Sequence, residues 1–372
     1  MLLGLAFRHS NHLAHCSRWH PVRSIMDLGS VVSCLNVLTP PALAEGWDNV
    51  GLLVEPSPPH QVHKLLLTND LTEDVLDEAI DTGANMILSY HPPVFKALKR
   101  ITQKSWKERL VVKALEKRLA VYSPHTSCDA LANGVNDWLA RALGPSKSVP
   151  LRASTSLTYP GGVGHLLEFR LDPAGNIMSR LNGIQGVSVC TSTARHDGDN
   201  GTRVSLSCSQ NALVEVLSIL SEEPQVYNSL QLLTLQKPPL VDTGMGRLCT
   251  LSEPVSIAAA LERIKKHLHL PHLRLALGRG RTLESSVSMA AVCAGSGSSI
   301  LSGVPAELYL TGEMSHHDVL DAVAEGRSVV LCEHSNSERG YLQELGGQIR
   351  QALEGQVQVV VSQRDRDPLQ VV

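Results

Sequence analysis

The stretch Ser328-Val329-Val330-Leu331-Cys332-Glu333-His334 joins a short apolar run to a histidine, and the chain repeats this arrangement twice more. Residues 86–90 run directly into His91, and residues 119–123 precede His125. Each run is short, rich in β-forming residues and followed by a helical pattern, which indicates a buried parallel strand. Ligands of open α/β sheets bind beyond the carboxyl ends of the strands. We therefore expect the three histidines to meet at one edge of one sheet.

Strand and helix patterns alternate along residues 27–150 and again along residues 240–372, as is typical of an α/β fold with a mostly parallel sheet. Neither half has a full sheet by its pattern, so we expect both halves to build one three-layer core. Residues 163–237 follow the order β-α-β-β-α-β and predict an inserted ferredoxin-like α+β domain. The Ser-, Pro- and Gly-rich residues 144–162 are interpreted as a linker.

Composition limits the classes of partner and the compartment. The formal charge of −3 gives no electrostatic reason to expect direct binding of nucleic acid or membranes. The eight cysteines are scattered without a CxxC pair, which indicates a reducing compartment. We therefore expect a protein of the cytoplasm.

The first 26 residues differ from the rest, because they contain arginines and histidines but no Asp or Glu. This composition fits a mitochondrial presequence, which gives an alternative location. A disordered tail, or an upstream extension with Met26 as a second start, fits it as well.

Acidic residues follow two of the histidines at a spacing of four. Glu338 follows His334, and the two share one face if a helix has begun by Ser335. Asp129 follows His125 across a loop, where a carboxylate can bridge two metals. Each pair also has an ordinary interpretation, as a solvated helix pair or as an Asp that caps the next helix. Convergence of imidazoles and carboxylates at one edge favours a divalent metal site.

Other residues near the expected edge each have more than one interpretation. His91 precedes Pro92-Pro93, which would hold its ring rigidly, although a lone histidine often only donates to a backbone carbonyl. Glu313 and His316 follow a neighbouring strand and are candidates for proton transfer or for supporting the ligands. The turn 295–299 could offer backbone N–H groups to an anion or be a plain tight turn.

The chain resembles the NIF-three-like family (Ngg-one-interacting factor three), especially its animal members, from about residue 27 to residue 372. Bacterial members of this family are often labelled GTP cyclohydrolase 1 type 2. The resemblance is carried by five motifs in family order: Gly46-Trp47-Asp48-Asn49-Val50-Gly51-Leu52, Ser89-Tyr90-His91-Pro92-Pro93, His125-Thr126-Ser127-Cys128-Asp129-Ala130, Thr311-Gly312-Glu313-Met314-Ser315-His316-His317 and Glu333-His334-Ser335-Asn336-Ser337-Glu338-Arg339-Gly340.

The resemblance implies a dinuclear metal centre and ring-like homo-oligomers, commonly hexamers of stacked trimers. The family's metal positions fall on His91, Asp129, His334 and Glu338, with His125 beside them. Bacterial relatives usually have two consecutive histidines where this chain has Tyr90 and His91, so one or two ions per chain (Zn, Fe or Mn) are consistent with the sequence.

Two functions follow as expectations. The first is a metal-dependent hydrolase that acts on an unidentified small substrate, with a nucleotide, another phosphate or a ring amidine left open. The second, which the family name implies, is a regulatory or adaptor protein that binds transcription-related partners in the cytoplasm and nucleus and retains a structural or vestigial metal.

Overall fold

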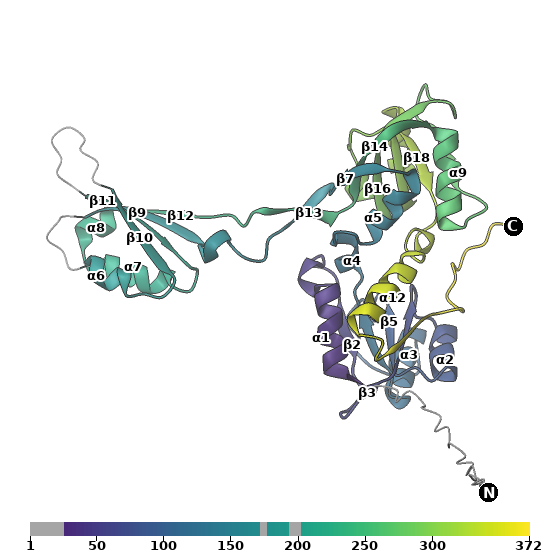
Figure 1. Ribbon diagram of the computed structural model, residues 1–372, viewed down its shortest axis with the longest axis horizontal. Helices are drawn as coiled ribbons and strands as arrows, with labels where there is room; N and C mark the ends of the chain where they lie inside the picture. Colours follow the sequence, from purple (N-terminus) through teal and green to yellow (C-terminus); the bar gives the residue numbers. More distant parts are fainter. Residues whose placement is uncertain (1–25, 172–176, 193–201) are drawn as a thin grey trace, which may run out of the picture.

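The computed structural model describes residues 26–171, 177–192 and 202–372. It contains two α/β lobes, each built on its own sheet, and a third unit at the end of a long connector (Figure 1). The α/β class predicted from the sequence is confirmed. The predictions for the N-terminal tail, apart from Met26, lie outside the described residues.

The first lobe has three layers around a five-stranded sheet of order β19-β4-β5-β6-β2. Neighbouring strands are parallel except at the β2 edge. Helices α1 and α12 pack on one face of the sheet, and α2 and α3 pack on the other. The strand bounds are β2 Gly51–Val54, β4 Lys64–Thr68, β5 Met86–Ser89, β6 Ala120–Ser123 and β19 Gln358–Val361, and the helix bounds are α1 Leu28–Leu38, α2 Glu73–Asp81, α3 Trp106–Glu116 and α12 Tyr341–Ala352.

Strand β4 shows why continuous apolar runs form the interior of this sheet. Leu65 and Leu67 point to the core beneath α1 and α12, whereas Leu66 points to the core beneath α2 and α3. Successive side chains of a strand face opposite sides, so a strand buried on both faces must be apolar at nearly every position. Thr72 is the N-cap of helix α2, and its hydroxyl accepts a hydrogen bond from the amide of Val75.

The second lobe contains a six-stranded sheet of order β15-β18-β17-β16-β14-β7. Only β16, β17 and β18 are parallel, so this sheet is more mixed than expected. Helices α5 and α9 cover one face, and α10 and α11 cover the other. The strand bounds are β7 Ser146–Val149, β14 Arg247–Ser256, β15 Arg274–Ala276, β16 Ser286–Ser296, β17 Leu308–Glu313 and β18 Ser328–Leu331, and the helix bounds are α5 Val135–Ala140, α9 Ile257–Leu268, α10 Ser298–Leu301 and α11 His316–Ala324.

The expectation of one sheet shared by both halves of the chain is wrong, because each lobe has its own sheet. The two halves of the chain instead each contribute one strand to the other half's sheet. The C-terminal strand β19 completes the first sheet, and β7, which precedes the third unit, completes the second. Residues 144–162 are therefore not only a linker, since they contain β7 and also β8 (Arg152–Thr155).

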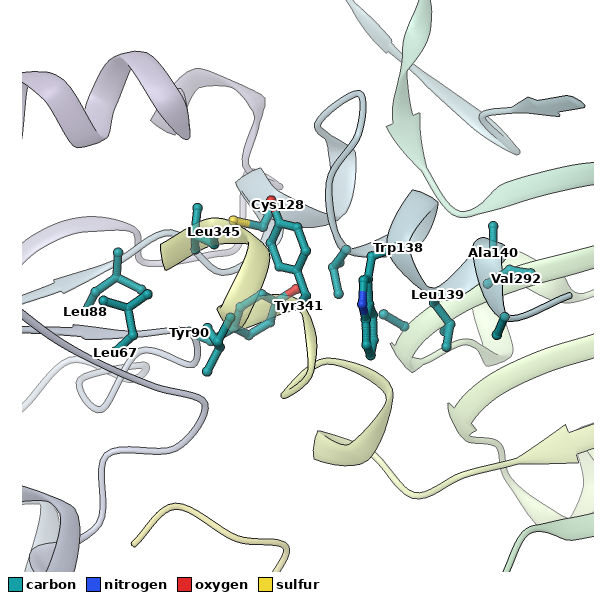
Figure 2. Close-up of a cluster of buried hydrophobic side chains, with 14 of the residues drawn as sticks. Leu67, Leu88, Tyr90, Cys128, Trp138, Leu139, Ala140, Val292, Tyr341 and Leu345 are labelled. Atoms are coloured by element: carbon teal, nitrogen blue, oxygen red, sulfur yellow. The ribbon is translucent and has the colours of Figure 1, made fainter. Parts of the chain in front are cut away.

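One apolar cluster continues through both lobes. Figure 2 shows Leu67, Tyr90 and Tyr341 on the side of the first sheet, and Trp138 and Val292 on the side of the second. Helix α12 contacts both α1 and α5, and a Cβ on Gly340 would lie 2.3 Å from the Trp138 ring. This packing fixes the two sheets relative to each other.

The third unit contains the expected order of elements and one additional short helix, α8. Its four strands are all antiparallel in the order β10-β11-β9-β12, and it lies beyond the β8–β13 pair (Figure 1). The bounds are β9 His165–Leu171, α6 Ile177–Asn182, β10 Val187–Ser192, β11 Thr202–Cys208, α7 Leu213–Ser221, α8 Pro224–Asn228, β12 Gln231–Thr234 and β13 Pro239–Met245. We propose residues 163–237 as the limits of an inserted domain. Among the described residues, no helix is long and apolar enough to cross a membrane.

Candidate metal centre

Three side chains from different parts of the chain converge between the two sheets. Ligand atoms of His91, His334 and Glu338 all lie within 4.8 Å of one another. His91 follows β5 of the first sheet, and His334 follows β18 of the second. The expected convergence therefore occurs between two sheet ends rather than along one edge.

Close backbone approach lets His334 and Glu338 reach this position. A Cβ on Gly295 would lie 2.7 Å from Glu338 Oε1 and 3.1 Å from His334 Nε2. A Cβ on Gly312 would lie 2.8 Å from the Cα of His334. Gly295 lies near the end of β16, and Gly312 lies near the end of β17, the strand next to β18. The absence of side chains at both positions makes room for the two ligands.

The spacing of His334 and Glu338 works through a different local structure from the one predicted. The turn between them, Ser335–Ser337, is a 3-10 helix, and α12 begins only at Tyr341. His334 Nε2 lies 3.5 Å from Glu338 Oε1 despite this difference. The turn 295–299 packs against this 3-10 helix. The Gly295 amide donates to Ser337 Oγ, and the Gly297 amide donates to the Glu313 carbonyl. Neither amide is therefore available to an anion.

His91 is held at one ring nitrogen, Nδ1, and its other nitrogen points at Glu338. Its Nδ1 lies 2.9 Å from Asp70 Oδ1, and its Nε2 lies 3.3 Å from Glu338 Oε2 without hydrogen-bond geometry. Burial disfavours the charged ring, but the carboxylates of Glu338 and Asp70 outweigh burial and raise the pKa of His91 to about 10. A ring nitrogen that is buried, oriented and without a hydrogen-bond partner suits a cation that would replace the proton.

Glu338 is a buried carboxylate at the centre of the group. Its side chain is only 4% exposed, and Oε2 also accepts a hydrogen bond from Asn69 Nδ2 at 3.2 Å. Burial alone would raise the pKa of Glu338, but His91 and His334 with the Asn69 amide hold it below its ordinary value. The carboxylate is therefore ionised, as a metal ligand must be.

The second ring nitrogen of His334 is bound by Glu313, one of the residues proposed for proton transfer. His334 Nδ1 lies 2.9 Å from Glu313 Oε1, and both side chains are partly exposed. A carboxylate that accepts the distal N–H of a histidine orients the other nitrogen toward a metal. His316 lies elsewhere, in a separate cavity with Arg274 and Val329, so the structure does not bring it to this group.

His125 and Asp129 lie beside the group on the first-lobe side. The rings of His91 and His125 are 5.3 Å apart between centroids, and His125 Nδ1 lies 2.7 Å from Asp48 Oδ1. Asp129, in the short helix α4 (Thr126–Ala130), accepts a hydrogen bond of 2.7 Å from the Tyr90 hydroxyl. The structure thus brings all five predicted metal residues into one neighbourhood, and the compact group of three is its centre.

This side of the site has Tyr90 where a two-histidine site would have a second imidazole, and burial raises the pKa values of both Asp129 and Tyr90. Burial, opposed by His125 and reinforced by Glu338, raises the pKa of Asp129 to about 6. Burial, with the charges of Asp129 and Glu338, raises the pKa of Tyr90 well above its ordinary value. In the metal-free protein Tyr90 is therefore a neutral phenol that donates to Asp129.

Sequence reasoning missed the residues that orient the ligands. Asn69 and Asp70 contact His91, and Asp48 contacts His125. The strand-end rule could have found Asn69 and Asp70, since they directly follow β4. Asp48 precedes its nearest strand and had no such signal.

A cavity of about 360 Å³ borders the centre and is lined by residues of both lobes. Its walls are Asp70, His91, Glu313, Glu333, His334, Ser335, Asp367, Pro368 and Leu369. The last three belong to the segment after β19, so the C-terminal end of the chain contributes one wall.

Comparisons with known proteins agree on one family. The family described as Duf34/NIF3 (NGG1p interacting factor 3) matches residues 26–368. NIF3-like protein 1 of Rattus norvegicus is 56% identical over 353 residues, which cover 94% of this chain and 94% of that protein. NGG1-interacting factor 3 of Saccharomyces cerevisiae is 28% identical over 358 residues, which cover 93% of this chain and 97% of that protein.

A solved structure supports the fold independently. Staphylococcus aureus protein SA1388 has a TM-score of 0.70 at 21% identity, and the match covers 93% of this chain and 99% of that one. At this level of identity the likeness concerns the fold alone. Together with the match along nearly the whole sequence, it shows that the chain belongs to the DUF34/NIF3 family.

Proposed function

We propose that the protein is a metal-dependent hydrolase acting on a small polar substrate. The observation that carries the proposal is the group His91, His334 and Glu338, in which each histidine is bound at Nδ1 by a carboxylate and presents Nε2 to the same point. Imidazole and carboxylate donors suit Zn, Fe or Mn, so the donor set fits a divalent ion.

The residues would divide the work in a definite way. His91, His334 and Glu338 would hold one ion, and His125 and Asp129 are placed to contribute to a second. A bound divalent ion supplies Lewis acidity and lowers the pKa of a bound water. Asp70 and Glu313 fix the histidine tautomers, because each accepts a hydrogen bond from a histidine Nδ1–H.

If only one ion binds, Asp129 is instead suited to hold a proton during hydrolysis. Its pKa of about 6 lies near neutrality, and the Tyr90 hydroxyl fixes one of its oxygens. A general base works best when its pKa is close to the working pH. Glu313, which is 52% exposed and accepts a hydrogen bond from His334 Nδ1, could exchange a proton with solvent.

The test compares two site variants with a surface control. Asp129→Ala and His334→Ala should abolish hydrolysis of a panel of nucleotides, phosphate esters and cyclic amidines, and should lower bound metal. His317→Ala, on an exposed residue of α11, should leave both unchanged. Hydrolysis that persists in protein stripped of metal would refute the proposal.

A second candidate function is an adaptor for transcription-related partners in the nucleus and cytoplasm. The yeast relative is named as an NGG1-interacting factor, and the neutral Tyr90 in place of a second histidine weakens a two-metal site. Pulldown with the wild type and Asp129→Ala tests it. Partners retained by the metal-deficient variant would support an adaptor, and partners lost with the metal would contradict a separate adaptor role.

We also propose that the chain forms a homo-oligomer, either a hexamer or another trimer-based assembly, as the family resemblance implies. Light scattering on the full chain would measure the mass. A monomer at micromolar concentration would contradict this proposal.

A further inference from the structure

We propose that Asp365, in the segment after β19, is a positioning residue of the metal centre. Its carboxylate joins the two stretches of chain that carry the ligands. The inference rests on the metal site of the proposed function and adds a residue that lies outside the five sequence motifs. The Asp365 side chain is only 3% exposed. A buried carboxylate is costly unless donors surround it, so the donors around Asp365 show what it supports.

The first donor comes from the end of β4. The backbone N–H of Asn69 donates to Asp365 Oδ2 at 2.9 Å. Asn69 in turn contacts two of the candidate ligands. Its side-chain Nδ2 donates to Glu338 Oε2 at 3.2 Å, and its carbonyl accepts the backbone N–H of His91 at 3.0 Å. Asn69 is fully buried, so the position of its backbone decides where both contacts fall.

The second donor is the guanidinium group of Arg339. Its Nε lies 3.2 Å from Asp365 Oδ2, and its Nη2 lies 3.4 Å from Oδ1. The same group also donates into the 3-10 helix that separates two of the ligands. Nη1 donates to Asn336 Oδ1 and Nη2 donates to Ser335 Oγ, each at 3.0 Å. Arg339 therefore ties that turn to the same carboxylate that holds Asn69.

The segment that carries Asp365 is itself fixed to the first lobe. Glu78 of α2 accepts the backbone N–H of Gln363 at 2.8 Å and that of Arg364 at 3.1 Å, and it also accepts the hydroxyl of Ser362. The Ser362 Oγ accepts the backbone N–H of Asp365 at 3.1 Å. These hydrogen bonds place the carboxylate through residues that do not touch the ligands.

A metal site needs this kind of support because its ligands must lie within about 0.2 Å of their proper distances. His91 and Glu338 are reached from Asp365 through Asn69, and the turn after His334 is reached through Arg339. Loss of the carboxylate would remove the acceptor from both connections at once. Residues that support ligands in this way typically contribute about 10- to 100-fold to metal affinity.

The test uses the full chain and two measurements: calorimetric titration with Zn²⁺, and the visible absorption spectrum of the protein loaded with Co²⁺, which depends on the arrangement of the ligands. Asp365→Asn should weaken Zn²⁺ binding about 10- to 100-fold and change the Co²⁺ spectrum. Arg339→Gln should weaken Zn²⁺ binding as well. If the two residues act only through their charges, the variants should differ in sign, because loss of a cation near the site favours a bound cation.

A double variant and a control for stability complete the design. Asp365→Asn combined with Arg339→Gln should bind Zn²⁺ within about twofold of the weaker single variant, because both changes break one connection. Val357→Ala removes buried core atoms just before β19 and should lower the thermal midpoint, while Zn²⁺ affinity and the Co²⁺ spectrum stay unchanged. If Asp365→Asn does not fold, Ser335→Ala takes its place and should weaken Zn²⁺ binding about two- to tenfold.

Three results would overturn the inference alone. The first is wild-type Zn²⁺ affinity in Asp365→Asn or Arg339→Gln, or tighter binding in Arg339→Gln. The second is a double variant in which the two losses multiply. The third is a loss of Zn²⁺ affinity in Val357→Ala as large as that in Asp365→Asn, which would make the effect one of stability. Wild-type protein that binds neither Zn²⁺ nor Co²⁺ would instead refute the metal centre of the proposed function, and this inference with it.

Discussion

A methyl group added at Gly295 should damage the metal centre although no ligand residue is substituted. The backbone of Gly295 has a φ of +64°, and a Cβ there would lie 2.7 Å from Glu338 Oε1. Ordinary contacts begin at 3.4 Å, so the carboxylate oxygen would have to move by about 0.7 Å (3.4 − 2.7). Metal sites tolerate displacements of only about 0.2 Å, so Gly295→Ala should weaken divalent metal binding at least about tenfold, or ~1.4 kcal/mol.

The same substitution also strains the backbone, and a control must remove that contribution. An Ala at positive φ costs about 1–2 kcal/mol of folding stability wherever it occurs. Gly355 has a φ of +69°, and a Cβ there would meet nothing within 4 Å. Gly355→Ala should therefore show the stability loss alone.

Two measurements separate these effects. Urea unfolding of metal-free protein should show a loss of about 1–2 kcal/mol in Gly355→Ala and a larger loss in Gly295→Ala, where the Cβ also displaces Glu338. Calorimetric titration with Zn²⁺ should show weakened binding only in Gly295→Ala. If both variants bind Zn²⁺ as tightly as the wild type, Gly295 does not make room for the proposed ligands.

Three further predictions concern Asp48, Tyr90 and His91. Asp48→Asn should weaken Zn²⁺ binding about 10- to 100-fold if His125 is a ligand, because Asp48 fixes the His125 ring; unchanged stoichiometry and affinity would exclude His125. Tyr90→Phe should destabilise the metal-free protein by about 1–3 kcal/mol at pH 8 in urea unfolding, because the buried Asp129 carboxylate loses a donor; an unchanged midpoint would contradict that role. His91 has a pKa of about 10 in the fold and 6.5 ordinarily, so its contribution to metal-free stability is complete below pH 6.5 and is lost as the pH rises through 10. Zn²⁺ must displace this proton, so binding heats at pH 7 in buffers of different ionisation enthalpy should reveal proton release, and equal heats would argue against His91 as a ligand.

The candidate ligands could be predicted because they follow buried strands. His91, His125 and His334 each come after an apolar run, and parallel strands present such residues at their carboxyl ends. The pattern does not say which strands share a sheet, so the prediction placed all three on one edge. In the structure His334 comes from a second sheet, brought close by the approach of Gly295 and Gly312.

The exchange of strands between halves lies beyond what periodicity reveals. β19 is a short apolar run like several others, and nothing within it specifies pairing with β4 at the opposite end of the chain. The same holds for β7, whose short, mostly polar sequence Ser-Lys-Ser-Val resembles a linker. Pairing depends on contacts between residues far apart in sequence, which a local pattern does not contain.

The central claim is that His91, His334 and Glu338 hold a divalent ion. Elemental analysis of the full chain, purified without a metal-affinity tag, tests it most directly. We predict at least one Zn, Fe or Mn per chain, falling to less than half an ion in His334→Ala and unchanged in His317→Ala. Wild-type protein that contains no bound divalent metal, and takes up none on dialysis against Zn²⁺, Fe²⁺ or Mn²⁺, would contradict the account.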